Sequence, residues 1–359
     1  MLEHCVPIRA PSLGDGAPAV ITPPPHDVWH EVLASDPDAL LSQTPEWIAA
    51  LCRDGIHEDA SRLYELPGGR RVVLPMVRRR GLPPALTVEA SLPPAWGIGG
   101  IVAPGGARPA DVAAVFRELS GRCTLQTSLT PNPLQAQAWA AARPPRTVTV
   151  PRLAHVLSLE DGFDRVWSSR FTGSARTAVR KAQRSGLTIE RSTDGGLVPV
   201  FLDLYQRSLR RWAHRQHEPL ALARFRARVR DPADKLRAMA SLGEIWVAFK
   251  DGMPAAAILV LQAAAAHYTR GAMDERIAGP TRANYLLHSL AIEAACISGC
   301  RHYHMGETGG SKSLAQFKTR FGARAYPYAA YHLERLPLTT ANRRLRSAVK
   351  RTIGFKDLS

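Results

Sequence analysis

The chain has 359 residues, 45% of them hydrophobic, and its 47 Lys and Arg exceed its 31 Asp and Glu to give a formal net charge of +16. This length predicts two domains, and the apolar content is ample for globular packing. The positive charge indicates one of two things. Either the partner is polyanionic (nucleic acid, a nucleotide-bearing substrate or an anionic membrane face), or the charge simply keeps a basic protein soluble.

Cysteine usage and hydropathy bear on the compartment. The five cysteines are an odd and sparse set, which does not predict a disulfide framework; they are Cys5, Cys52, Cys123, Cys296 and Cys300. No apolar run reaches the roughly 20 residues needed to span a bilayer, and no signal-peptide pattern opens the chain. We therefore expect a soluble, cytoplasmic protein that is a monomer.

The first part of the chain divides into an irregular leader, residues 1–28, rich in Pro, Gly and Ala, and a first domain, residues 29–150. Thr44 is expected to cap a helix whose first position is Pro45. Apolar runs bounded by turn residues predict the other elements. These are strands at 61–66, 71–77, 86–91, 98–102, 123–127 and 147–150, and helices at 110–119 and 134–142.

A second domain, residues 151–335, repeats this alternation, and residues 336–359 form a basic amphipathic tail. Asp251-Gly252 lies between two apolar runs and predicts a β-hairpin. Strands are expected at 155–159, 187–191, 244–249, 255–262, 266–271 and 325–333, and helices at 163–168, 174–184, 198–212, 220–229, 282–298 and 313–319. The mixed order in both halves predicts an α/β (α+β) fold of two related domains.

Residues 303–322, YHMGETGGSKSLAQFKTRFG, form the main candidate site. Gly306, Gly309 and Gly310 allow positive φ angles or the close approach of a ligand. Lys318 adds a cation beside flexible backbone amides, a combination that suits the oxyanion formed during acyl transfer. A surface loop with a solvated lysine is the alternative interpretation.

The sequence does not predict a metal site. Cys296, Cys300, His302 and His304 are residue types that bind zinc. However, the usual two-residue spacing between cysteines is missing, and both cysteines fall near the end of a helix. Apolar packing is therefore the interpretation that we adopt for them.

Most of the excess charge lies in residues 165–237, which contain 17 Lys and Arg and 6 Asp and Glu, a net charge of +11. Solubility requires no such clustering, so this concentration favours a phosphate-bearing ligand; a solvated helical face is the alternative. The tail places Leu345, Val349 and Ile353 on one helical face, with Arg and Lys on the other sides. It could dock on the body of the protein, on nucleic acid or on a membrane surface.

Three segments resemble the Fem-type peptidyltransferases and the wider Fem-like acetyltransferase group of the GNAT superfamily, most clearly over residues 163–322. Residues 176–186 (RTAVRKAQRSG) are similar to the family's basic helix, and residues 251–256 (DGMPAA) to its hairpin. Residues 317–322 (FKTRFG) are similar to its closing FK-x-x-FG signature. A weaker similarity lies at residues 44–47 and 96–106.

The resemblance implies two tandem GNAT-like domains and acyl transfer to an amine. Fem-type members take an aminoacyl group from aminoacyl-tRNA, and other members take an acyl group from coenzyme A. By position, the phenylalanine–lysine pair of the signature becomes Phe317 and Lys318. In the family this pair helps to bind the donor end and to stabilise the tetrahedral intermediate.

The chain departs from the family pattern in three places. Residues 276–283 (RIAGPTRA) stand where acyl-CoA enzymes hold pyrophosphate on backbone amides, and Pro280 has no N–H to donate. His304 stands where many relatives have an acid, which leaves the general base open between His304 and Glu307. Residues 187–244 are too short for the helical arm that some Fem proteins insert there.

We therefore predict an aminoacyl-tRNA-dependent transferase that forms an amide on an amine acceptor, with aminoacyl-tRNA as co-substrate and no cofactor. The acceptor is a small molecule or a nucleotide-linked peptide, on a peptidoglycan-precursor or specialised-metabolite pathway. Alternatives are an acyl-CoA-dependent N-acyltransferase and a non-catalytic nucleic-acid-binding protein. The candidate catalytic residues are Lys318, Phe317, Glu307 and His304; the candidate substrate-binding residues are Arg176, Arg180, Lys181, Arg211, Trp212, His214, Tyr268, Arg270 and Arg320.

Overall fold

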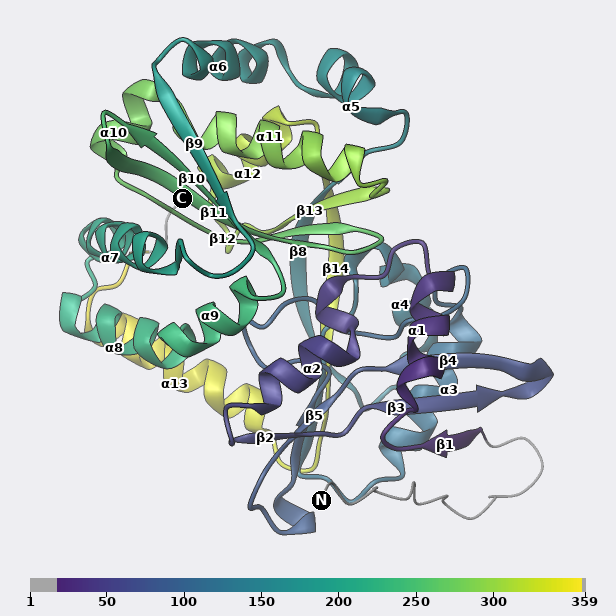
Figure 1. Cartoon of the computed structure of the whole chain (residues 1–359). Helices are drawn as coiled ribbons and strands as arrows, with labels where there is room; N and C mark the ends of the chain where they lie inside the picture. The colour runs from purple at the N-terminus through teal and green to yellow at the C-terminus, as the bar shows by residue number, and fades with distance from the viewer. Residues whose placement is uncertain (1–17, 357–359) are drawn as a thin grey trace, which may run out of the picture. The chain divides into compact units, whose positions relative to one another are not determined.

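The computed structural model describes residues 18–356 (Figure 1). They form two compact units: the first comprises the described residues up to Arg152 together with Pro327–Ala341, and the second comprises Leu153–Tyr326 and the described residues from Asn342. Both contain mixed sheets and helices, which is the α/β class predicted. The late segment Pro327–Ala341 belongs to the first unit, whereas the sequence-based ranges end the first domain at residue 150.

The first unit contains two sheets. One has the order β1-β3-β4, and the other β2-β5-β6-β7-β14; within the second sheet only the β6–β7 pair is parallel. The elements are β1 (Ala19–Ile21), α1 (His26–Ser35), η1 (Leu41–Gln43), α2 (Pro45–Cys52), β2 (His57–Asp59), β3 (Arg62–Leu66), η2 (Pro67–Gly69), β4 (Arg70–Leu74), β5 (Val77–Arg79), η3 (Pro84–Leu86), β6 (Val88–Ala90), α3 (Pro109–Ser120), β7 (Gln126–Leu129), η4 (Pro133–Gln135), α4 (Ala136–Ala142) and β14 (Arg324–Glu334).

Local sequence explains the start of α2. The Thr44 side chain accepts a hydrogen bond from the backbone N–H of Trp47 at 3.2 Å, and Pro45 occupies the first helical position, as predicted. The expected irregular leader is wrong for its described part, because β1 and the start of α1 lie within it; residues 1–17 fall outside the described residues.

The strand expected at 98–102 is also wrong. Its described backbone forms an isolated bridge between Val102 and Val73. Side chains take the place of a strand partner: Ser42 Oγ donates to the carbonyl of Ile98 at 2.6 Å, and the Gln43 amide donates to that of Gly99 at 3.0 Å. Carbonyl groups that accept these side-chain hydrogen bonds do not need a neighbouring strand as partner. The glycines of WGIGG also weaken strand formation.

The second unit is built on a sheet in the order β8-β13-β12-β11-β10-β9, in which only the β12–β13 pair is parallel. Its elements are β8 (Val148–Ser158, which begins before the unit), α5 (Gly162–Arg165), η5 (Val166–Arg170), α6 (Gly173–Gln183), β9 (Leu187–Ser192), α7 (Val198–Arg215), α8 (Leu220–Arg230), α9 (Ala233–Ala240), β10 (Glu244–Lys250), β11 (Met253–Gln262), β12 (Ala266–Met273), α10 (Glu275–Thr281), α11 (Ala283–Ile297), β13 (His302–Glu307), α12 (Lys312–Arg320) and α13 (Leu338–Thr352, which also begins before it).

Helices cover both faces of this sheet, with α5, α6 and α11 over one face and α7, α8 and α9 over the other (Figure 1). The hairpin between β10 and β11 turns at Asp251 and Gly252, whose φ angles of 50° and 75° are both positive, as a two-residue turn requires. Three expectations differ from the structure: the strands expected at 147–150 and 155–159 form the single strand β8, and neither α9 nor α10 was predicted.

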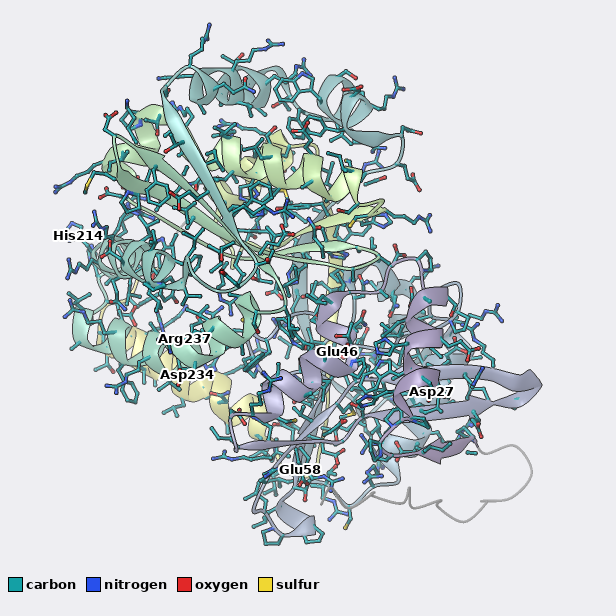
Figure 2. All side chains as sticks on the ribbon, viewed as in Figure 1. Asp27, Glu46, Glu58, His214, Asp234 and Arg237 are labelled. Atoms are coloured by element: carbon teal, nitrogen blue, oxygen red, sulfur yellow. The ribbon has the colours of Figure 1, made fainter. Side chains whose placement is uncertain are left out.

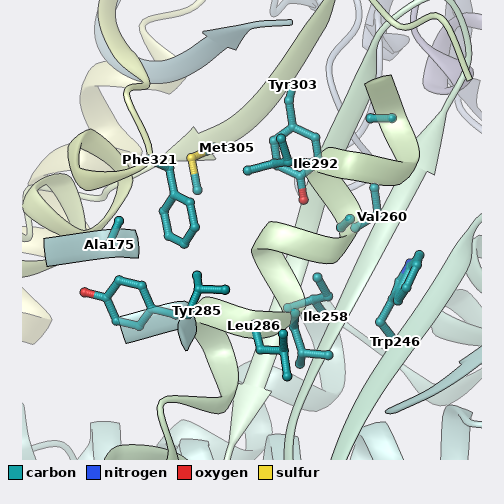
Figure 3. Packing of buried hydrophobic residues seen from close by; sticks show 14 of the residues in the cluster. Ala175, Trp246, Ile258, Val260, Tyr285, Leu286, Ile292, Tyr303, Met305 and Phe321 are labelled. Carbon is teal, nitrogen blue, oxygen red and sulfur yellow. The ribbon is translucent and has the colours of Figure 1, made fainter. Parts of the chain in front are cut away.

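The core of the second unit lies between its sheet and α11. Ile258 and Val260 of β11 pack with Leu286 and Ile292 of α11, and Phe321 joins them from the end of α12 (Figure 3). The buried residues of α11 include the consecutive run 285–289, so this part of the helix is enclosed on all sides. This packing fixes α11 and α12 against the ends of β12 and β13.

Candidate functional site

The candidate site in the second unit is built around Lys318. Ser311 caps α12 by accepting a hydrogen bond from the N–H of Leu314 at 3.3 Å, and the helix then carries Lys318 across the end of β13. The side chain is buried, and Nζ donates to the carbonyl oxygens of Gly306 at 2.9 Å and Glu307 at 2.7 Å. The ammonium is therefore held at the carboxyl end of a strand, away from bulk water.

A bulge at the end of β13 presents these carbonyls to Lys318. The register of β13 on β8 shifts between His304 and Gly306, and Gly306 has a φ of +71°. A Cβ at Gly306 would lie 3.6 Å from the carbonyl oxygen of Tyr268, which is an ordinary contact. The positive φ, rather than lack of space, accounts for glycine at this position.

The parallel strands β12 and β13 pair over two residue positions, Ala266 with Tyr303 and His267 with His304. The two histidine rings lie 6.2 Å apart between their centroids in an edge-to-face arrangement. Beyond these pairs, β12 continues to Met273 and β13 to Glu307. The Lys318 ammonium binds β13 just past the point where this pairing ends.

Burial controls the charge of this site. It lowers the pKa of Lys318 from 10.5 to about 7, although the charge of Glu307 opposes the shift. Burial and the nearby positive charge of Lys318 lower the pKa of His155, and they lower that of His288 to about 3. For His267 the same two causes act together with Arg270, and its pKa falls to about 3. At neutral pH these imidazoles are neutral, while the lysine lies near its titration midpoint.

Phe317 lies beside Lys318 in sequence but faces an aromatic cluster. Its ring centroid is 5.0 Å from that of Tyr285, 5.3 Å from that of His288 and 5.2 Å from that of Phe321. Arg320 Nη1 donates to the Tyr285 hydroxyl at 2.9 Å. The signature thus has an apolar side and a cationic side, as the sequence suggested.

The structure brings together six of the predicted residues: Lys318, Phe317, Glu307, His304, Tyr268 and Arg320. Tyr268 lies edge-to-face on His288, with 4.6 Å between the ring centroids. Glu307 is exposed at the end of β13, whereas His304 is completely buried.

Three predicted binding residues lie on α6. Arg176 Nη1 donates to the carbonyls of Trp167, Ser168 and Phe171, so its guanidinium holds the end of η5. Arg180 lies over the Trp167 ring, 5.9 Å from its centroid, and Lys181 is exposed. Arg176 therefore has a structural contact, whereas Lys181 faces solvent.

Four other predicted binding residues lie on α7 and β12. Arg211 donates to the carbonyl of Met273 at 3.1 Å, and Trp212 packs edge-to-face on Tyr205. His214 is exposed (Figure 2). Arg270 Nη2 binds Asp231 at 2.8 Å. Among residues 18–356, Lys318 hydrogen-bonds to none of these four side chains.

Sequence reasoning missed three buried histidines of the site, His155, His267 and His288. Each is a single histidine within an apolar run, on β8, β12 and α11 respectively. A polar residue interrupting a buried run was the signal that could have found them. The elements are distant in sequence, so only the sheet order brings the three residues together.

Among the described residues, two surface hollows lie away from the Lys318 site, and neither a metal site nor a membrane-spanning helix is formed. Two surface hollows of about 490 and 520 Å³ lie in the first unit, and no residue of the Lys318 site lines them. Within residues 18–356 no group of three or more His, Cys, Asp or Glu could hold a metal ion. In the same part of the chain, no helix has the length and apolar character needed to cross a membrane.

Comparisons with known proteins concern the domain and the fold that carry this site. The acetyltransferase (GNAT) domain matches residues 169–319, a range that contains the basic helix, the hairpin and Lys318. No curated protein matches the sequence.

Among solved structures, the fold is similar to FemX, with a TM-score of 0.63 and 12% identity over 86% of this chain and 96% of that one. It is also similar to the C-terminal domain of a protein assigned as a lysylphosphatidylglycerol synthetase from Agrobacterium fabrum, with a TM-score of 0.50 and 14% identity over 89% and 97%. Residues 169–319 thus match a GNAT acetyltransferase domain, which indicates an acyltransferase, and the fold of the chain is similar to that of FemX.

Proposed function

We propose that the chain transfers an aminoacyl group from aminoacyl-tRNA to an amine acceptor, with Lys318 stabilising the oxyanion. The observation that carries the proposal is the buried Lys318 ammonium, held by the Gly306 and Glu307 carbonyls at the end of β13. A preorganised cation in a site that excludes water stabilises developing negative charge more strongly than one in solvent.

The reaction needs alignment more than activation, because the aminoacyl ester is already reactive. The amine nitrogen attacks the ester carbonyl carbon and forms a C–N bond, and negative charge develops on the carbonyl oxygen near Lys318. The nitrogen loses a proton, the ester C–O bond breaks, and the tRNA hydroxyl leaves with a proton. Glu307 is exposed at the end of β13, so it can accept the amine's proton more readily than the fully buried His304.

Two features favour a tRNA donor. The first is the cluster of basic residues over 165–237, which includes the exposed basic residues Arg180 and Lys181 of α6. The second is the segment that corresponds to a pyrophosphate loop, which is the helix α10. There the amides of Ile277 and Ala278 bond to the carbonyl of Asp274, and the amide of Arg276 bonds to its carboxylate. Amides engaged in this way are poor donors to a pyrophosphate.

Acyl-CoA is the second candidate donor, because the domain that matches residues 169–319 is described as an acetyltransferase. The name of the Agrobacterium protein, in contrast, includes a lysyl group, which is an aminoacyl group. Ribonuclease degrades tRNA but not acyl-CoA, so it should stop transfer only if aminoacyl-tRNA is the donor.

The test is to incubate the purified protein with radiolabelled aminoacyl-tRNAs and a panel of amines that includes peptidoglycan precursors, with and without ribonuclease. We expect labelled amide that disappears when ribonuclease is added first. Label transferred from acetyl-CoA, unaffected by ribonuclease, would support the second donor. If neither donor gives product, and Lys318→Ala binds tRNA as well as the native protein does, a non-catalytic RNA-binding role would replace the proposal.

A further inference from the structure

Two helices of the second unit expose apolar side chains between basic ones. On α13, Leu345 is 65% exposed and Val349 is 44% exposed, one helical turn apart on the same face. The other sides of the helix carry Arg343, Arg344, Arg346, Lys350 and Arg351. No acidic residue occurs in α13, and none of its residues is buried.

The helix α8 has the same design. Ala223 and Ala227 are buried against the protein, while Phe225 and Val229 on the other side are 67% and 68% exposed. The exposed side also carries Arg224, Arg226, Arg228 and Arg230. Arg226 binds Glu218 at 2.8 Å, and Arg230 lies 3.7 Å from Asp231, but no acidic residue lies within α8 itself.

A backbone contact ties the two helices together. After α13, the N–H of Lys356 donates to the carbonyl of Gln216 at 2.8 Å, and Gln216 precedes the first residue of α8, Leu220, by only a few positions. The end of α13 is therefore held near the start of α8 (Figure 1). The two exposed stripes thus belong to one region of the second unit.

We propose that α8 and α13 dock on the surface of an anionic lipid bilayer. The four exposed apolar side chains would enter the boundary between headgroups and acyl chains, and the surrounding Arg and Lys would bind lipid phosphates. Amphipathic helices that combine apolar and basic faces bind membranes in this way, and each cation near an anionic surface adds to the attraction.

The positive charge of α8 and α13 would by itself suit RNA as well as an anionic bilayer. The exposed apolar side chains therefore decide between these two partners. Aliphatic residues such as Leu345 and Val349 gain nothing from a phosphate backbone, because it offers no apolar surface to cover them. A lipid interface removes them from water. This inference does not depend on the transfer reaction, since it concerns residues outside the Lys318 site.

The test measures co-sedimentation of the full chain with vesicles of phosphatidylcholine, with and without phosphatidylglycerol. We expect binding to the anionic vesicles only. The double variant Leu345→Gln/Val349→Gln keeps the charge of the protein and should weaken vesicle binding by at least about tenfold. Phe225→Gln should also weaken vesicle binding.

The matched control is Ile297→Gln. Ile297 is 81% exposed at the end of α11, so it is an equally accessible apolar residue of the same unit. It should leave vesicle binding unchanged, and tRNA affinity should be the same for all variants. The proposal is overturned if the native protein does not sediment with anionic vesicles. It is also overturned if the double variant binds them as tightly as the native protein does, or if the double variant loses tRNA binding instead.

Discussion

Burying a lysine costs free energy unless polar groups replace the lost water, and Lys318 has two carbonyls for this purpose. These contacts do not keep the pKa of Lys318 at its ordinary value of 10.5, because burial lowers it to about 7. The residue is thus held in a fixed position and is close to losing its proton at neutral pH. Perturbed ionisable groups of this kind are concentrated at functional sites.

Replacing Lys318 by alanine should lower the kcat of acyl transfer by about 100-fold, because the oxyanion loses its preorganised cation. The control is Lys312→Ala, which removes an exposed lysine of the same helix and should leave kcat unchanged. Steady-state kinetics with aminoacyl-tRNA as donor would measure both, and thermal unfolding would verify that the variants are folded. An unaltered kcat in folded Lys318→Ala would remove Lys318 from the mechanism.

The activity should also depend on pH through Lys318. A cation that stabilises an oxyanion must be protonated, so the Lys318 contribution to kcat is present below a pH of about 7 and is lost as pH rises through this value. Lys318→Arg keeps the charge at all accessible pH values and should lack this alkaline decrease. A lysine acting as general base would give the opposite sign, with a kcat that rises through pH 7.

At the scale of single elements, the closing signature serves two purposes. Phe317 and Lys318 belong to the candidate site, whereas Phe321 and Gly322 end α12 and attach it to the core. Phe321 is buried, and its ring centroid lies 5.0 Å from that of Phe171. Gly322 has a φ of +82°, and a Cβ there would lie only 2.5 Å from the carbonyl oxygen of Arg170. The position therefore excludes every residue except glycine.

Gly322→Ala should destabilise the protein by about 2–3 kcal/mol, since strain at positive φ adds to a clash with backbone. Gly309→Ala is the matched control: its φ is +58°, but no atom lies within 4 Å of the added Cβ, so about 1 kcal/mol is expected. Urea unfolding would compare the two variants. Equal losses of stability would show that the contact with Arg170 is not tight.

At the scale of the whole molecule, the charge of +16 is unevenly distributed. Residues 165–237 alone carry a net charge of +11, and α13 adds five cations without an acid. Several of these residues bind neighbouring carboxylates, as Arg226 binds Glu218. Others at the end of α6, such as Lys181 and Arg184, are exposed. Exposed cations of this kind can neutralise the phosphates of a nucleic acid.

If aminoacyl-tRNA is the donor, its affinity should fall steeply with salt, because binding releases counterions. Lys181→Gln/Arg184→Gln should reduce the slope of log affinity against log salt by about 1 for each cation that neutralises a phosphate in the native complex. Arg79→Gln/Arg80→Gln, which removes two exposed arginines of the first unit, should leave the slope unchanged. Filter binding at several salt concentrations would measure the slopes. Equal effects of the two pairs would indicate that the clustered charge has no special role.

Local patterns were sufficient for much of the fold. The capping residue Thr44 and the Asp251-Gly252 turn depend on interactions within a few residues, and the structure confirms both. The helix predicted at 282–298 is also present, as α11. The predicted class, two related α/β domains, follows from the order of such elements. The failure at residues 98–102 has a tertiary cause, because Ser42 and Gln43 bind that backbone from far away in the sequence.

By itself, the sequence determined the α/β class, the Fem-like signature and the position of Phe317 and Lys318 within it. Only the tertiary structure decided that Lys318 is buried, that its pKa lies near 7, and that His155, His267 and His288 lie around it. The physical reason is that burial and electrostatics depend on which elements pack together. Here those elements are the strands β8, β12 and β13 and the helices α11 and α12, which meet only in the folded second unit.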